Sequence, residues 1–356
     1  HGPLQFHLIT LSYFLLGDND FSARVPYALA GIAAIGLVAF AFRRYLGKAG
    51  AVIAAFLFLI SPYMLYYSRY TRNEVLGVLI VLLTIYAVLR YLEKGDKFSL
   101  ILFVVATALD FTDKATAYIF TAQLLLFLLV VLVEGVQHLK WKREGQHTQF
   151  KLLTFLTIGM LLVTLGFAVW NAAVNKVDPE AVEQTVEAAA AQPMTFQAVG
   201  EIAGLGLAVV LGLVALVTLV RGTGWRQIRT QRSFDLIVLT GALILPLLSP
   251  IPVKLLGWDP LDYSGLGIQR TGVFLGILTA LSLAIGLWWK PRLYPLMFAI
   301  FYAIFTVFYT SFFTSGFGFF KGLVGALGYW MSQQAVNRGT QPLYYYIVVH
   351  LPIYEY

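Results

Sequence analysis

Long apolar runs separated by short polar loops make up most of this chain. About 20 mostly apolar residues are needed for a helix to cross a bilayer. Runs of this kind predict spans near 23–42, 49–68, 75–92, 98–111, 115–134, 152–172, 196–220, 234–252, 268–288 and 293–313, and an eleventh begins near 342. The pattern predicts an all-α, polytopic transmembrane helical bundle with about ten full spans and a partial one.

Three polar or mixed stretches lie outside these spans and are expected on the outer face. Residues 1–21 and 314–341 predict interfacial segments, the second because Lys321 and Arg338 frame a Gly- and aromatic-rich stretch. The outer loop 173–195 is rich in Ala and Glu and predicts a short surface helix starting at Asp178-Pro179. We expect a single transmembrane domain over 1–356 that is truncated at both ends, because both ends lie within sequence that looks structured.

Composition agrees with the membrane assignment. Apolar residues make up 59% of the 356 residues and charged residues only 12%, about half the charged share of a soluble domain. The chain has no cysteine, which excludes disulfides, iron–sulfur clusters and thiolate metal sites. It also lacks the HExxH, GxxxxGK[ST] and GxSxG motifs, so metalloprotease, P-loop ATPase and α/β-hydrolase functions have no support.

Most of the net charge of +7 follows from membrane topology. Sixteen of the 25 basic residues fall in alternate loops, as the positive-inside rule requires of the cytoplasmic side. These are Arg43, Arg44, Lys48, Arg90, Lys94, Lys97, Lys140, Lys142, Arg143, Lys151, Arg221, Arg226, Arg229, Arg232, Lys290 and Arg292. A nucleic-acid partner is not needed to explain the charge, and we expect chemistry on the outer, extracytoplasmic side of the plasma membrane.

Ionisable groups at the ends of spans are the candidates for that chemistry, since charges near the membrane are costly. The segment SRYTRNEV places Arg69, Arg72 and Glu74 between two spans. An arginine pair suits a phosphate while the carboxylate binds a hydroxyl or a metal. The alternative is a turn whose arginines reach the headgroups, and Arg24 has the same alternative as a headgroup anchor.

Two further polar clusters complete the set of candidates. DFTDK carries Asp110, Asp113 and Lys114 at the tip of a helical hairpin, where the lysine can bind a phosphate or pair with an aspartate. The other cluster suits a sugar or a diphosphate, or is simply loop polarity. Its members are Gln269, Arg270, Gln333, Gln334, Arg338 and Gln341.

Several stretches resemble those of a known superfamily. HGPLQFHLITLSYFLLGDNDFSARVPYALAGIAA, SPYMLYYSRYTRNEVLGVLIVLLTIYA and TALDFTDKATAYIF are similar to the Pro-Leu box, the following spans and the hairpin of GT-C membrane glycosyltransferases. That superfamily includes the protein mannosyltransferases and the lipid A aminoarabinose transferases. GALGYWMSQQAVNRGTQPLYYYIVVHLPIYE resembles the flippase-activity-associated membrane proteins of archaea and some bacteria. The resemblance covers about 1–135 and 320–356.

The resemblance implies an inverting transferase that takes a sugar from a polyprenyl-phosphate donor. The acceptor would be a glycan, a lipid or a protein. Family members keep their main catalytic carboxylate before the Pro-Leu box, upstream of His1 and outside this chain. The second family carboxylate corresponds to Glu74 and the hairpin lysine to Lys114. Arg69, Arg72 and Arg270 are then further candidates for the donor phosphate, and Asp110, Asp113, Gln333 and Arg338 for the substrate cavity.

The cofactor and the class of function stay open at this point. A divalent metal at Glu74 is compatible with the sequence, although no set of neighbouring ligands is evident. The alternative to an enzyme is a non-enzymatic carrier of lipid-linked glycans, a flippase-associated protein or an accessory subunit of a membrane complex. A carboxylate pair in the first outer loop would favour the enzyme.

Overall fold

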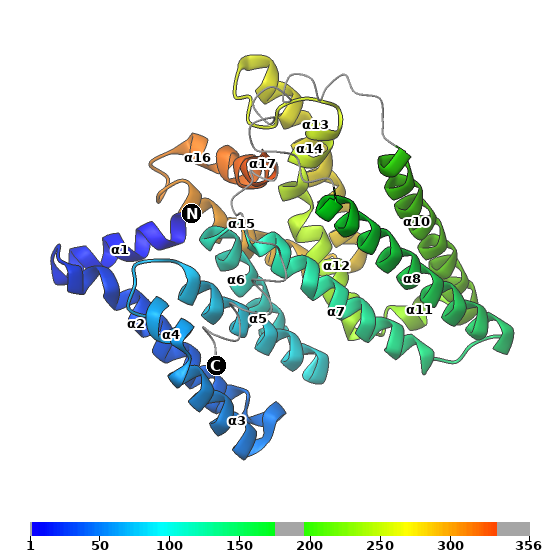
Figure 1. The fold of residues 1–356 in the computed structure, drawn as a ribbon, viewed down its shortest axis with the longest axis horizontal. Coiled ribbons are helices and arrows are strands. Elements are labelled where there is room, and N and C mark those ends of the chain that lie inside the picture. Colours follow the sequence, from blue (N-terminus) through cyan, green and yellow to red (C-terminus); the bar gives the residue numbers. More distant parts are fainter. Residues whose placement is uncertain (1, 175–195, 333–356) are drawn as a thin grey trace. The chain divides into compact units, whose positions relative to one another are not determined.

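Within residues 2–174 and 196–332, which the computed structural model describes, every regular element is a helix (Figure 1). The all-α fold predicted from the apolar pattern is therefore confirmed. The helices form two compact units, one comprising residues 1–129 and 235–356 and the other residues 130–234. Three predicted segments lie outside the described residues: the outer loop 173–195 apart from 173–174, residues 333–341 of the interfacial segment, and the span that begins near 342.

The first part of the larger unit contains the segments expected to carry chemistry. Its helices are α1 (Pro3–Leu16), α2 (Asp20–Gly36), the π-helical η1 (Leu37–Ala41), α3 (Arg43–Ile60), α4 (Pro62–Tyr67), α5 (Glu74–Lys94), α6 (Lys97–Asp113) and α7 (Ala117–Gln137), whose last turns pass into the smaller unit. α6 packs against α5 on one side and α15 (Tyr294–Tyr309) on another, and α1 packs on both α2 and α6.

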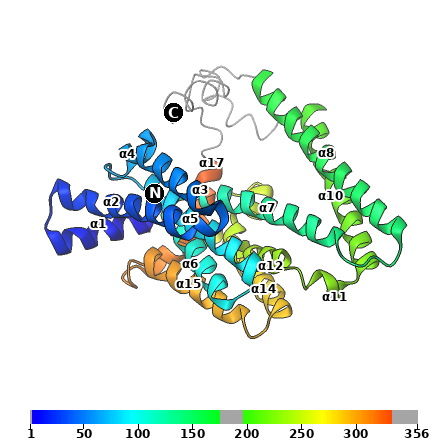
Figure 2. The same cartoon turned by 90° about the horizontal axis from the view of Figure 1, so that it is seen from below.

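The second part of the larger unit begins at Asp235, within α12. Its elements are α12 (Arg232–Ile244), the 3₁₀-helix η3 (Leu245–Leu248), α13 (Pro250–Leu255), α14 (Gly265–Trp289), α15, α16 (Gly316–Phe320), the π-helical η4 (Lys321–Gly325) and α17 (Ala326–Ser332). The smaller unit consists mainly of α8 (Glu144–Val174) and α10 (Phe196–Thr223), which lie side by side in both views (Figures 1 and 2), and of the short α11 (Trp225–Ile228).

Five segments in the described residues are long and apolar enough to cross a membrane. They are Asp20–Ala41, Glu74–Lys94, Ala117–Gln137, Gly206–Thr223 and Gly265–Trp289. Length and composition support a polytopic membrane protein, while the predicted number of ten spans stays a prediction. The predicted short run at 98–111 forms α6, and the predicted interfacial helix near the N-terminus forms α1.

The predicted span 234–252 is not one continuous α-helix, because the structure divides it into α12, η3 and α13. Prolines at 246, 250 and 252 remove backbone N–H donors from the helical ladder. Pro246 leaves the Ala242 carbonyl without its helical partner, and the Ser282 hydroxyl donates to that oxygen at 2.6 Å. A side chain of α14 thus satisfies a buried carbonyl, which makes the break tolerable in an apolar environment.

Two other predicted spans end earlier than expected. The segment 49–68 is helical only to Ile60, after which Ser61 caps a new short helix by accepting from the Met64 N–H at 3.3 Å. The segment 293–313 is helical to Tyr309. Ser311, Phe312 and Phe313 then adopt positive φ angles of 48°, 56° and 69°, a left-handed conformation that ends the right-handed helix.

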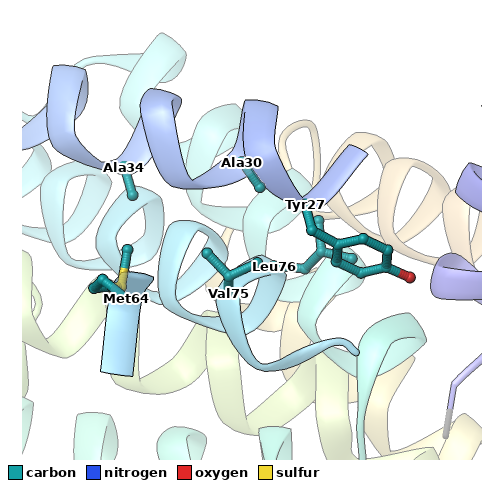
Figure 3. Packing of buried hydrophobic residues seen from close by; sticks show 6 residues of the cluster. All are labelled: Tyr27, Ala30, Ala34, Met64, Val75 and Leu76. Atoms are coloured by element: carbon teal, nitrogen blue, oxygen red, sulfur yellow. The ribbon is translucent and has the colours of Figure 1, made fainter. Parts of the chain in front are cut away.

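Small residues allow α2 to approach α5 closely. Ala30 and Ala34 of α2 face Val75 and Leu76 of α5 in the close-up of this core (Figure 3). Tyr27 and Met64 fill the two ends of the cluster. Side chains this small let helix backbones pack tightly in a membrane protein, and here they hold the first turn of α5, which begins with Glu74.

Candidate active site

A two-residue connection places the start of α5 beside the end of α6. Gly95 ends α5 in the left-handed conformation, with φ 69°, and its N–H donates to the Tyr91 carbonyl at 2.8 Å. Asp96 caps α6 by accepting from the Ser99 N–H at 3.0 Å. Hydrogen bonds from Ser99, with a further one from Arg90, lower the pKa of Asp96 to about 2. The resulting antiparallel pair brings Glu74 and Asp113 to the same end of the bundle.

Two cationic side chains contact the same carboxylate oxygen of Glu74. Lys114 Nζ donates to Glu74 Oε1 at 3.2 Å, and Arg72 Nη2 lies 3.0 Å from the same atom. The Glu74 side chain is only 12% exposed, whereas the Lys114 and Arg72 side chains are 34% and 43% exposed. The two cations therefore neutralise the carboxylate while each keeps part of its surface available to a ligand.

A cavity of about 300 Å³ adjoins this cluster. Polar residues on its wall come from the start of α5, the end of α6 and the turn before α7, namely Asn73, Glu74, Asp113, Lys114 and Thr116. The remaining lining residues are Tyr63, Gly77, Val78, Val81, Leu82 and Phe120. A concave apolar site with a few convergent polar groups is the usual form of a ligand pocket, and this volume is at the lower end of the usual range.

Only part of the predicted set of cations reaches this cavity. Lys114 lines it, and Arg72 pairs with Glu74 without lining the cavity itself. Arg69 lines a different cavity of about 470 Å³ together with Arg24. Arg270, in the first turns of α14, has its guanidinium 4.7 Å from the centre of the Trp258 ring. Gln333 and Arg338 lie outside the described residues, so their predicted place in the cavity stays a prediction.

The two hairpin aspartates take different positions. Asp113 is 1% exposed and lines the Glu74 cavity. Asp110 is 6% exposed and lines a smaller cavity of about 140 Å³ with Thr107 and Thr121. Lys114 pairs with Glu74 at the start of α5, in place of the aspartate partner that the sequence left as an alternative.

Sequence reasoning missed two residues that organise the helices. Asn73 is completely buried and its Nδ2 donates to the main-chain oxygen of Asp113 at 3.0 Å, which ties the start of α5 to the end of α6. Its signal was the preference of Asn for the position just before a helix. The second residue is Asp235. Its signal was an acidic side chain at the start of a predicted span, where a charge is costly and indicates a specific role.

Asp235 accepts hydrogen bonds from three side chains, which belong to α5, to α14 and to the residue directly after α14. Its carboxylate accepts from Tyr91 Oη at 2.7 Å, Trp289 Nε1 at 2.7 Å and Lys290 Nζ at 2.8 Å. The carboxylate is thus fully engaged by protein donors from α5 and the end of α14. We interpret Asp235 as a structural link, because its carboxylate joins α12 to α5 and to the end of α14.

The residues around Glu74 do not form a convincing metal site. Among the described residues, no group of three or more His, Asp or Glu side chains is close enough to hold a metal ion. Lys114 and Arg72 occupy one oxygen of Glu74, and their charges would repel a divalent cation bound to the same carboxylate.

Comparison with known proteins gives the class of this region. Residues 1–170 match the family described as dolichyl-phosphate-mannose-protein mannosyltransferase. This match confirms the resemblance of residues 1–135 to the mannosyltransferases, while the resemblance of 320–356 to flippase-activity-associated proteins stays a prediction. The matched range contains Glu74, Lys114, Asp113 and the whole cavity described above.

The curated relative found covers less of the chain. A Bacillus subtilis (strain 168) protein named "Putative mannosyltransferase YkcB" is 28% identical over 130 residues, which is 36% of this chain and 18% of that protein. This chain therefore spans a minor part of the relative's length. No solved structure matches the chain. Together with the apolar helices, the family match indicates a multi-pass membrane protein whose N-terminal region is similar to GT-C glycosyltransferases.

Proposed function

We propose that this protein is a membrane glycosyltransferase of the GT-C type. In this proposal it transfers a sugar from a polyprenyl-phosphate donor to an acceptor on the outer face of the plasma membrane. The observation that carries the proposal is the Glu74–Lys114–Arg72 cluster beside a cavity of about 300 Å³, within the region that matches the mannosyltransferase family.

The charges of the cluster fit the two ends of such a reaction. The acceptor oxygen forms a bond to the anomeric carbon while the bond from that carbon to the phosphate oxygen breaks, which inverts the configuration. Negative charge develops on the departing polyprenyl phosphate, and we assign its stabilisation to Lys114 and Arg72. The acceptor hydroxyl loses a proton, which requires a carboxylate within hydrogen-bond reach.

We assign Glu74 to the acceptor hydroxyl. Its Oε1 is held by the two cations, while its Oε2 is buried and has no hydrogen-bond partner in the described part of the chain. That second oxygen is therefore free to accept the hydroxyl hydrogen and to orient the nucleophile. In this proposal the Glu74 carboxylate takes the proton that the acceptor hydroxyl loses.

A neighbouring apolar cavity supports a lipid-linked donor. It has a volume of about 620 Å³ and is lined by Ala54, Leu57, Phe58, Ile60, Ser61, Pro62, Tyr63, Met64 and Val78. Tyr63 and Val78 line both this cavity and the Glu74 cavity. A polyprenyl chain lying along α3 and α4 would thus deliver its phosphate to Lys114 and Arg72.

Transfer measured in lipid nanodiscs tests the proposal. With dolichyl-phosphate mannose as donor and a panel of glycan, lipid and peptide acceptors, we expect the wild type to release dolichyl phosphate. Glu74→Gln should lower that rate at least about 100-fold, since it removes a charge used in the transition state. Glu93→Gln is the matched control, because Glu93 lies on the same helix and pairs with Arg44, away from the cavity.

Two results would contradict the proposal. Equal turnover in wild type and Glu74→Gln would remove Glu74 from the site. Binding of polyprenyl-phosphate sugars by the wild type without turnover of any of them would favour the alternative, a carrier or accessory subunit for lipid-linked glycans.

A further inference from the structure

Three buried oxygen atoms at the Glu74 cavity lack hydrogen-bond donors in the described part of the chain. They are Asn73 Oδ1, Glu74 Oε2 and Asp113 Oδ1. All three residues line the same cavity. Buried polar atoms are almost always hydrogen-bonded in native proteins, so three acceptors left open at one place need donors from outside the chain, supplied by water or by a ligand that displaces it.

The orientation of Asn73 is fixed by its other atom. Asn73 Nδ2 donates to the Asp113 carbonyl oxygen at 3.0 Å, and the Gly2 N–H donates to the same oxygen at 2.8 Å. Because Nδ2 is engaged in this way, Oδ1 is the part of the Asn73 amide that remains available to a ligand. Asn73 is 0% exposed and Asp113 1% exposed, so leaving their oxygen atoms without a donor is costly.

The ligand donors are hydroxyl groups in preference to a cation. Lys114 and Arg72 already supply two positive charges at Glu74 Oε1, and a third positive group nearby would be repelled. A neutral polyol supplies O–H donors without adding charge. The acceptor oxygens suit the sugar of a sugar phosphate, and Lys114 on the cavity wall, with Arg72 beside Glu74, suits its phosphate.

We propose that Asn73 and Asp113, with Glu74 Oε2, form a subsite that recognises the hydroxyl groups of the transferred sugar. This rests on the proposed function, because it names the part of the donor that enters the same cavity. Asn73 and Asp113 are then residues that determine which sugar is accepted, separate from the phosphate contacts of Lys114 and Arg72.

Binding to the full chain in nanodiscs isolates the sugar contribution. The probes are dolichyl-phosphate mannose, dolichyl-phosphate glucose and dolichyl phosphate without sugar. We expect the wild type to bind one of the sugar-bearing lipids roughly 10- to 100-fold more tightly than dolichyl phosphate, the range given by satisfying a buried polar group. Asp113→Asn and Asn73→Leu should each lose at least about five-fold of that preference while still binding dolichyl phosphate.

Thr112→Val is the control variant. Thr112 is buried next to Asp113, but its hydroxyl donates to the Leu109 carbonyl and it does not line the cavity. It should keep the full preference for the sugar-bearing lipid. Asp113→Asn is nearly isosteric, so it decides the matter if Asn73→Leu does not fold.

The outcomes separate this inference from the proposed function. A wild type without preference for a sugar-bearing lipid, or a preference unchanged in both variants, overturns the subsite. A preference that depends on Asn73 and Asp113 in a protein that transfers no sugar supports the subsite and contradicts the transferase. Transfer at the wild-type rate from donors that lack individual hydroxyls would likewise overturn the subsite while leaving the transferase intact.

Discussion

Lys114 Nζ lies 3.2 Å from Oε1 of Glu74, although 40 residues separate them along the chain. The first residue of α5 thus binds the residue that caps α6. Because both side chains are partly withdrawn from solvent, each depends on the other for charge compensation. Substitutions at the two positions should therefore not act independently.

A double-mutant cycle with Glu74→Gln and Lys114→Met measures this dependence. We expect each single variant to lower the transfer rate at least about 100-fold and the double variant to cost far less than the product of the two, since residues in contact couple. The measurement is kcat/KM with dolichyl-phosphate mannose. Lys97→Met, at the opposite end of α6, serves as the control and should have little effect. Fully multiplicative effects would show that the pair does not act as a unit.

Replacement of Asp235 should destabilise the protein without changing the chemistry. Asp235→Ala removes the acceptor of three hydrogen bonds and leaves Lys290 without its carboxylate. The expected loss is about 2 kcal/mol or more, because hydrogen bonds to a charged group are among the stronger ones. Thermal unfolding in detergent checks this, with the exposed Asp18→Ala as control. Unchanged unfolding temperature would contradict the structural role, as would a loss of transfer per folded molecule.

Two glycines on α14 provide a matched pair for the packing of α14. A methyl group at Gly286 would overlap the ring of Tyr294, which is completely buried, whereas one at Gly276 would meet no atom within 4 Å. Gly286→Ala should lower stability by about 1–3 kcal/mol through overpacking. Gly276→Ala should be neutral or slightly stabilising, because Ala favours a helix. Equal unfolding temperatures for the two variants would argue against the close contact of Gly286 with Tyr294.

Labelling of single cysteines tests the predicted topology. The chain has no cysteine of its own, so each introduced thiol reports alone. A membrane-impermeant maleimide added to intact cells should label Asp18→Cys and spare Arg226→Cys until the membrane is permeabilised. Both positions are exposed. The reverse pattern, or labelling of both from outside, would overturn the assignment of the basic loops to the cytoplasm.

The hydrophobic pattern and the charge distribution were sufficient to predict a helical membrane protein and the ionisable residues Glu74 and Lys114 at helix ends. These properties depend on local composition and on the cost of charge in lipid, so they can be read from a linear sequence. The limits of the helices were less accurate where prolines broke 234–252, because the outcome depended on Ser282 of another helix satisfying the Ala242 carbonyl.

The partners of each charge were decided only by tertiary structure. The sequence grouped Arg69, Arg72 and Arg270 with Lys114, yet packing brings only Arg72 and Lys114 to Glu74. It gave no reason to link Asn73 to Asp113 or Asp235 to Tyr91, which is 144 residues away. The physical reason is that such contacts depend on how far packed helices are shifted along each other and on how each is rotated about its axis. A shift in register by one residue turns a side chain toward a different neighbour.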